Sequence, residues 1–139
     1  MKPHKLGLLL GIISMVIIAG CGNQSGSVST CDTTDCFVAA ANTCSPTVFT
    51  STETFGVVEF SSASDCTYMK KMISFNSEAP SLKSMLDGKN MTCSYERGAF
   101  DSKWLKYLIL GAEKCNGELK ERLGELLPIY VAKTQDTTT

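Results

Sequence analysis

Seven cysteines are spread along this chain of 139 residues, and they constrain its fold more than any other feature. Six of them lie in one stretch, at Cys31, Cys36, Cys44, Cys66, Cys93 and Cys115. An even number of cysteines in a small exported domain predicts a disulfide framework, here of three bridges. The spacing selects no particular pairing, because six cysteines can be joined in many ways. Each bridge would stabilise the domain by about 2–4 kcal/mol.

The seventh cysteine, Cys21, follows an N-terminal segment typical of export. Lys2 and Lys5 precede an apolar run at residues 6–19. This run is shorter than the 20 or so residues of an ordinary membrane-spanning helix and suits the centre of a signal peptide. Its end, Ile18-Ala19-Gly20-Cys21, resembles a lipobox, the processing signal of bacterial lipoproteins.

The lipobox resemblance implies that residues 1–20 are removed and that Cys21 becomes the lipidated first residue, carrying chains such as palmitate. Two or more acyl chains give stable anchoring, so we expect the protein at the extracytoplasmic face of the cell membrane or outer membrane. Gly22, where an aspartate tends to retain lipoproteins in the inner membrane, favours the outer membrane by analogy. The alternatives are an uncleaved N-terminal membrane helix, or an ordinary secretory signal that leaves Cys21 unpaired.

The remaining chain predicts one domain on a short tether. Without Lys2 and Lys5 it has 11 basic and 14 acidic residues, a net charge of −3, and no basic run, so nucleic acid is not an expected partner. Small polar residues at 21–30 predict a lipidated, flexible tether. We expect a single disulfide-rich domain at residues 31–131 and a disordered tail at 132–139.

The pattern of apolar residues predicts an α+β fold, in which an N-terminal helix precedes an antiparallel sheet of about four strands and C-terminal helices pack on it. Runs rich in Val, Phe, Thr and Tyr predict strands at residues 47–52, 54–61, 66–75 and 89–96. Helical spacing or caps predict helices at residues 35–43, 81–86, 102–110 and 113–127, the last ended by Pro128.

Two expectations concern burial. The helix at 102–110 is apolar on most sides, through Trp104, Leu105, Tyr107, Leu108 and Ile109, so we expect it to be the most buried helix. Lys70 and Lys71 lie in the middle of the strand at 66–75, and we expect both to reach solvent.

Four short motifs together resemble a known group. They are Asn42-Thr43-Cys44-Ser45-Pro46, Asp65-Cys66, Gly88-Lys89-Asn90-Met91-Thr92-Cys93 and Cys115-Asn116-Gly117-Glu118-Leu119. This set is similar to small cysteine-containing predicted lipoproteins of archaea and little-studied bacteria, a group of unknown function. The resemblance implies a single helix–sheet–helix domain, and it carries over no catalytic residue. Cys31 is additional to the five-cysteine pattern of that group.

Candidate catalytic groups are few. The only histidine, His4, lies in the predicted signal peptide, so histidine-based nucleophile pairs and metal sites are excluded from the mature chain. There is no Cys-x-x-Cys and no glycine-rich phosphate loop, and we expect no cofactor and no metal. Carboxylate chemistry at Asp32 and Asp35, or among Glu118, Glu121 and Glu125, and a Ser–Lys site at Asp101, Ser102 and Lys103 stay as alternatives to helix-start and surface roles.

Five aromatic residues can line an apolar ligand pocket between sheet and helix, or simply fill the core: Tyr68, Tyr95, Phe100, Trp104 and Tyr107. We therefore expect a non-catalytic binding or structural protein of the envelope, held to the membrane by its lipid and contacting a protein or a small ligand. The alternative is a surface-anchored hydrolase that uses carboxylates or a Ser–Lys pair.

Overall fold

The protein folds around one curled sheet of six strands, in a computed structural model that describes residues 27–135. The strands lie in chain order: β1 (Ser29–Cys31), β2 (Thr47–Glu53), β3 (Gly56–Ser62), β4 (Thr67–Phe75), β5 (Asn90–Ser94) and β6 (Cys115–Asn116). The β1–β2 pair is parallel and the other pairs are antiparallel. The α+β class is therefore confirmed, with two more strands than expected. The predicted signal peptide, Cys21 and the first part of the predicted tether lie outside the described residues.

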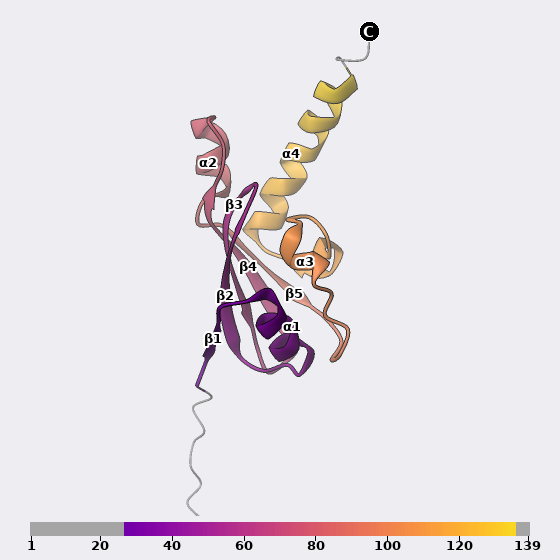
Figure 1. Cartoon of the computed structure of the whole chain (residues 1–139). Helices are drawn as coiled ribbons and strands as arrows, with labels where there is room; N and C mark the ends of the chain where they lie inside the picture. Colours follow the sequence, from indigo (N-terminus) through magenta and orange to yellow (C-terminus); the bar gives the residue numbers. More distant parts are fainter. Residues whose placement is uncertain (1–26, 136–139) are drawn as a thin grey trace, which may run out of the picture.

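The first helix, α1 (Thr34–Asn42), connects the parallel strands β1 and β2. Thr33 caps it, since its hydroxyl accepts a hydrogen bond from the backbone N–H of Cys36. A strand precedes this helix, because the end of the predicted tether pairs with β2 instead of remaining free. Helix α1 packs on the inner face of the sheet (Figure 1), where Phe37 and Ala41 are fully buried.

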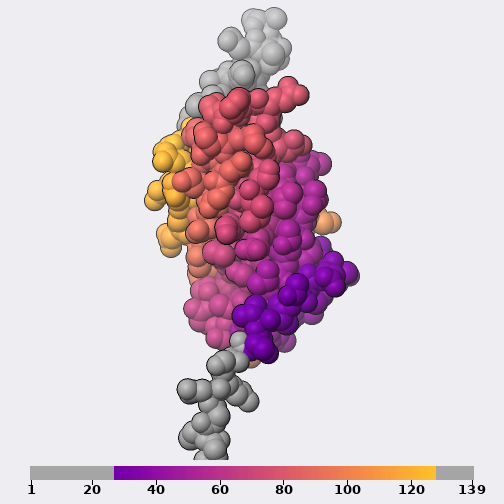
Figure 2. All heavy atoms as spheres, turned by 90° about the vertical axis from the view of Figure 1, so that its left-hand side faces the viewer, coloured from indigo at the N-terminus to yellow at the C-terminus, as the bar shows by residue number. Residues whose placement is uncertain are grey.

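Buried and more exposed residues alternate along the strands, so the sheet has one face toward the core and one toward solvent. In β3 and β4 the inward residues include Val58, Phe60, Tyr68 and Met72, all at most 1% exposed. Phe37 of α1 lies 5.9–6.1 Å, between ring centroids, from the inward phenylalanines of β2 and β3. In the space-filling view of Figure 2, the middle strands form much of the visible surface and α4 lies only at its edge.

The C-terminal elements differ most from expectation. Helix α2 (Pro80–Leu86) agrees with the sequence, but α3 (Lys103–Lys106) is a single turn, followed by an irregular loop at residues 107–111 and a 3₁₀ turn, η1 (Ala112–Lys114). The expectation of a long, most buried helix at 102–110 is wrong. Trp104 and Leu108 are half-buried, and Tyr107 is 57% exposed.

The last helix, α4 (Glu118–Gln135), begins five residues later than predicted and continues past Pro128. It begins late because Cys115 is drawn into strand β6 by its disulfide to Cys93. Proline removes one hydrogen bond from a helix interior without necessarily ending the helix. The predicted tail at 132–139 overlaps the end of α4, and residues 136–139 lie outside the described part. Among the described residues, no helix combines the length and apolarity needed to cross a membrane.

All six cysteines of the domain are paired, as the even count predicted. The bridges are Cys31–Cys36, Cys44–Cys66 and Cys93–Cys115. They join β1 to α1, the chain after α1 to the start of β4, and β5 to β6. Each bridge thus ties an outer element to the sheet or to its neighbour. Three disulfides are consistent with an extracytoplasmic location.

Candidate functional site

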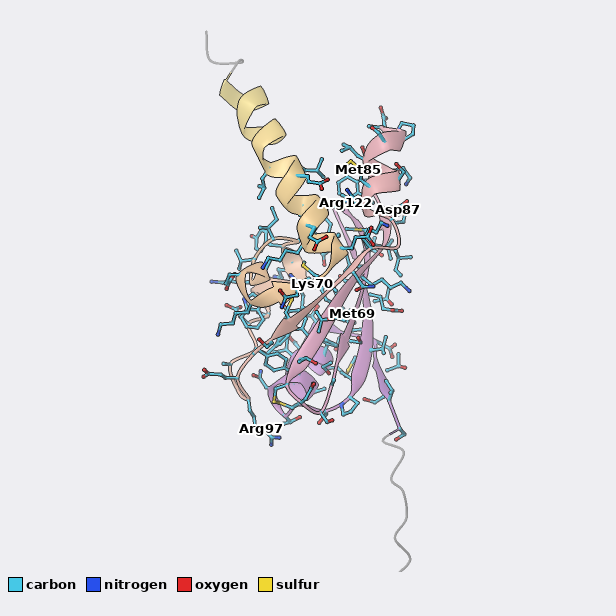
Figure 3. All side chains as sticks on the ribbon, turned by 180° about the vertical axis from the view of Figure 1, so that it is seen from behind. Met69, Lys70, Met85, Asp87, Arg97 and Arg122 are labelled. Atoms are coloured by element: carbon cyan, nitrogen blue, oxygen red, sulfur yellow. A yellow bond between two sulfur atoms is a disulfide. The ribbon has the colours of Figure 1, made fainter. Side chains whose placement is uncertain are left out.

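A buried lysine organises the chain that follows α3. Lys70 of β4 is 0% exposed, so the expectation that it reaches solvent is wrong. Its ammonium Nζ donates hydrogen bonds to three backbone carbonyls, those of Tyr107 at 3.2 Å, Leu108 at 3.4 Å and Leu110 at 3.1 Å. Figure 3 labels this side chain, which lies between β4 and the loop at 107–111. All three donors of the ammonium are thereby used, so Lys70 acts as a clamp on that loop.

The Lys70 clamp explains why the helix at 102–110 is not formed. Tyr107 takes an extended conformation, with φ −126° and ψ 129°, and ends α3 after one turn. In a continuous helix the carbonyls of this segment would point along the helix axis to later N–H groups. Here three of them converge on one ammonium instead. The sequence signal that could have revealed this burial is the alternation along β4, which puts Lys70 on the same face as Tyr68 and Met72.

Burial changes the acid–base properties of this region. Loss of solvation lowers the pKa of Lys70 to about 8, partly offset by the carboxylate of Glu113. Burial, and then the same carboxylate, raise the pKa of Tyr68, so its phenol stays protonated. The Tyr68 hydroxyl is buried and has no hydrogen-bond partner among the described residues.

The clamped loop presents apolar side chains to solvent. Tyr107 is 57% exposed, Ile109 48% and Leu110 44%. Beside them, a pocket of about 590 Å³ is lined by Phe55, Trp104, Tyr107, Leu108, Ile109, Leu110, Gly111 and Glu113. A second pocket of about 340 Å³, between the loop and α4, shares Ile109 and Glu113 with the first and reaches Leu127 of α4, which is 44% exposed. We call the exposed side chains of Tyr107, Ile109, Leu110 and Leu127, with these two pockets, the Ile109 surface.

Gly111 closes the loop against Trp104. Its φ of +78° lies in the left-handed region, which glycine adopts without strain. A Cβ at this position would lie 2.8 Å from the Trp104 indole ring, so any side chain would displace that ring. Trp104 in turn stacks on Tyr68, with ring centroids 5.8 Å apart and planes within 7°. The Ile109 surface therefore has a rigid base.

Of the five aromatic residues considered for a ligand pocket, the structure brings four together. Tyr68, Tyr95, Phe100 and Trp104 form a cluster with neighbouring ring centroids 5.0–5.9 Å apart. The Tyr95 hydroxyl donates to the carbonyl of Ala41 at 2.8 Å. The first three of these side chains are buried, whereas Trp104 and the separate Tyr107 line the larger pocket of the Ile109 surface.

The candidate carboxylates have structural partners. Glu118 pairs with Lys89 at 2.6 Å and lies 3.9 Å from Arg122, and its pKa is lowered chiefly by the hydrogen bond from Lys89. Arg122 also pairs with Glu125 at 3.1 Å, whereas Glu121 is exposed on the same helix. These charges lie on the surface of α4, as expected for a solvated helix face.

The other candidates lie at helix starts. Asp35 is in the first turn of α1, and Asp32 is exposed just before it. Asp101 accepts a hydrogen bond from the backbone N–H of Lys103 at 2.8 Å. In the described part of the chain, no hydrogen bond joins the side chains of Ser102 and Lys103. Nor does any group of three or more Cys, His, Asp or Glu side chains there lie close enough to hold a metal ion.

Comparison with known proteins adds no functional assignment to this geometry. No protein-family model, curated protein or solved structure matches the chain significantly.

Proposed function

We propose that this protein is a lipid-anchored, non-catalytic binding protein of the cell envelope, and that the Ile109 surface is its binding site. One observation carries the proposal. Of the six large apolar side chains that are strongly exposed among the described residues, four lie on this surface. Clustered apolar exposure of this kind is typical of interaction sites, whereas scattered exposed residues are ordinary.

The membrane anchor in this proposal rests on the N-terminal sequence. The segment Ile18-Ala19-Gly20-Cys21 follows a basic start and an apolar run, and three disulfides fit the compartment that a lipoprotein enters. The described domain starts close behind Cys21. A chain extends at most about 3.6 Å per residue, so the domain would stay within tens of ångströms of the membrane.

Mass spectrometry of the mature N-terminus tests the anchor. We expect residues 1–20 to be absent and Cys21 to carry acyl chains, which contribute about 0.8 kcal/mol of membrane affinity per buried methylene. Replacing Cys21 with alanine should abolish the acylation and leave residues 1–20 attached, because the processing signal is lost. A mature N-terminus at Cys21 without acyl chains in the parent protein would contradict the lipid anchor.

A fluorescent dye that reports apolar surfaces tests the binding site. The sole tryptophan, Trp104, lines the larger pocket, so anilinonaphthalene sulfonate bound there should accept energy from it. We expect Ile109→Ser to weaken dye binding several-fold, because an exposed apolar contact is lost. Ile73→Ser is the matched control, since Ile73 is 43% exposed but lies on β4, outside both pockets. Equal effects of the two changes would contradict a site at the Ile109 surface.

A further inference from the structure

The exposed loop of the Ile109 surface is flanked by lysines. Residues 102–114 contain Lys103, Lys106 and Lys114 against one acidic residue, Glu113, a net charge of +2. The rest of the chain from residue 21 carries −5. All three lysine side chains are exposed, and none of them forms an ion pair among the described residues. The most apolar exposed segment is thus also a local positive region of an acidic protein.

We propose that the Ile109 surface docks onto the surface of an anionic phospholipid bilayer. Ile109 and Leu110 would enter the boundary between headgroups and acyl chains, Tyr107 would lie at headgroup level, and the three lysines would face lipid phosphates. This combination of apolar, aromatic and basic side chains is the one that binds membrane interfaces. The proposal deepens the binding function above by naming its partner as the membrane itself.

The charge and shape of the Ile109 surface favour a bilayer over a small molecule or a second copy of the chain. The two pockets lie side by side and open to solvent, whereas a small-molecule site encloses most of its ligand. A second copy of the chain would bring two regions of charge +2 together, which is unfavourable. An anionic surface is instead attracted to each lysine that approaches it within a Debye length.

The Lys70 clamp reduces the conformational entropy that the loop loses on docking. The three hydrogen bonds from its ammonium fix the loop before any lipid is met, and Gly111 seats the loop on Trp104. A loop that is already ordered loses little freedom on binding. A short tether would also keep the surface at a high effective concentration near the bilayer.

Vesicle co-sedimentation tests the proposal without the lipid anchor. The protein is the chain from residue 21 onward with Cys21→Ser, which retains the whole described core and all three disulfides. We expect it to bind vesicles of phosphatidylglycerol and phosphatidylcholine at least about tenfold more tightly than pure phosphatidylcholine, and more weakly as salt is added. Trp104 emission should shift to the blue on binding.

Two sets of variants locate the contact. Ile109→Ser with Leu110→Ser, and separately Lys106→Glu, should each weaken binding by about tenfold or more. The matched control is Ile73→Ser with Lys71→Glu, which changes the same residue types on β4 and should leave binding unchanged. Absence of binding to anionic vesicles at low salt would overturn the proposal. An equal loss of vesicle affinity in the control variant would overturn it as well. So would self-association of the protein through this surface in analytical ultracentrifugation.

The outcomes separate this inference from the proposed function. The dye could bind beside Trp104 in a way that depends on Ile109 while the protein fails to bind vesicles. The Ile109 surface would then remain a binding site, but its partner would not be the bilayer. If mass spectrometry found no acyl chains on Cys21, the vesicle result would still stand, because the Cys21→Ser protein used with vesicles carries no lipid.

Discussion

Replacing Lys70 with alanine should lower the free energy of unfolding by about 3–5 kcal/mol, measured by urea denaturation and followed by Trp104 fluorescence. Removing a fully buried long side chain leaves a cavity, at a cost similar to that of Met→Ala. It also leaves the carbonyls of Tyr107, Leu108 and Leu110 without their donor. Lys70→Met fills the space without donating, so it should cost only about 1–3 kcal/mol.

The control for this prediction is Lys71→Ala. Lys71 is the neighbour of Lys70 on the opposite face of β4 and is partly exposed, so its loss should change stability by less than about 0.5 kcal/mol. If Lys70→Ala unfolded at the same urea concentration as the parent, the Lys70 clamp would not hold the loop at 107–111.

The stability of the parent relative to Lys70→Met should also depend on pH in a defined direction. The pKa of Lys70 is lowered from 10.5 to about 8 in the folded protein, because burial penalises the charged ammonium. Below pH 8 both folded and unfolded chains hold the proton, and the difference is constant. Between pH 8 and 10.5 the unfolded chain binds more protons, so the parent should gain stability as pH rises. A loss of relative stability over that range would contradict this account.

Removing the Cys93–Cys115 bridge should be the second large effect. Replacing both cysteines with alanine should lower the free energy of unfolding by about 3 kcal/mol, because the bridge restricts an unfolded chain over a separation of 22 residues. Alanine avoids burying two hydroxyl groups where both side chains are 1% exposed. Thermal or urea denaturation under non-reducing conditions measures the loss.

The Cys31–Cys36 bridge provides the comparison. Its separation is only 5 residues, so its removal should cost about 2 kcal/mol or less by the same entropy argument. A larger loss for Cys31–Cys36 than for Cys93–Cys115 would show that loop closure does not govern these bridges. The Cys44–Cys66 bridge, also separated by 22 residues, should resemble Cys93–Cys115.

Local sequence signals succeeded where the local and tertiary preferences agree. The threonine cap and apolar spacing predicted α1, and the β-branched and aromatic runs predicted strands β2 to β5. The parity of the cysteine count predicted that all six are bridged. These features depend on residues close together in the chain or on a simple count, so no long-range contact was needed to infer them.

The candidate site was predicted only in part. Trp104 and Tyr107 were two of five aromatic residues expected either to line a ligand pocket or to fill the core, and both line the larger pocket of the Ile109 surface. Ile109 and Leu110 were assigned to a buried helix and missed as exposed residues. Helical periodicity at residues 102–110 could not reveal that three carbonyls of the loop accept hydrogen bonds from a strand residue 37 to 40 positions earlier.

The sequence alone determined the secondary-structure class, most strands, the first two helices and the complete pairing of the domain's cysteines. Only the tertiary structure decided which cysteines pair, the order of six strands, and the burial of Lys70. Each of these depends on groups far apart in the chain meeting in space: Cys93 with Cys115 makes β6, and Lys70 with the loop at 107–111 ends α3. The free energy of such contacts outweighs the local helical preference of that segment, because propensity contributes only a fraction of a kcal/mol per residue.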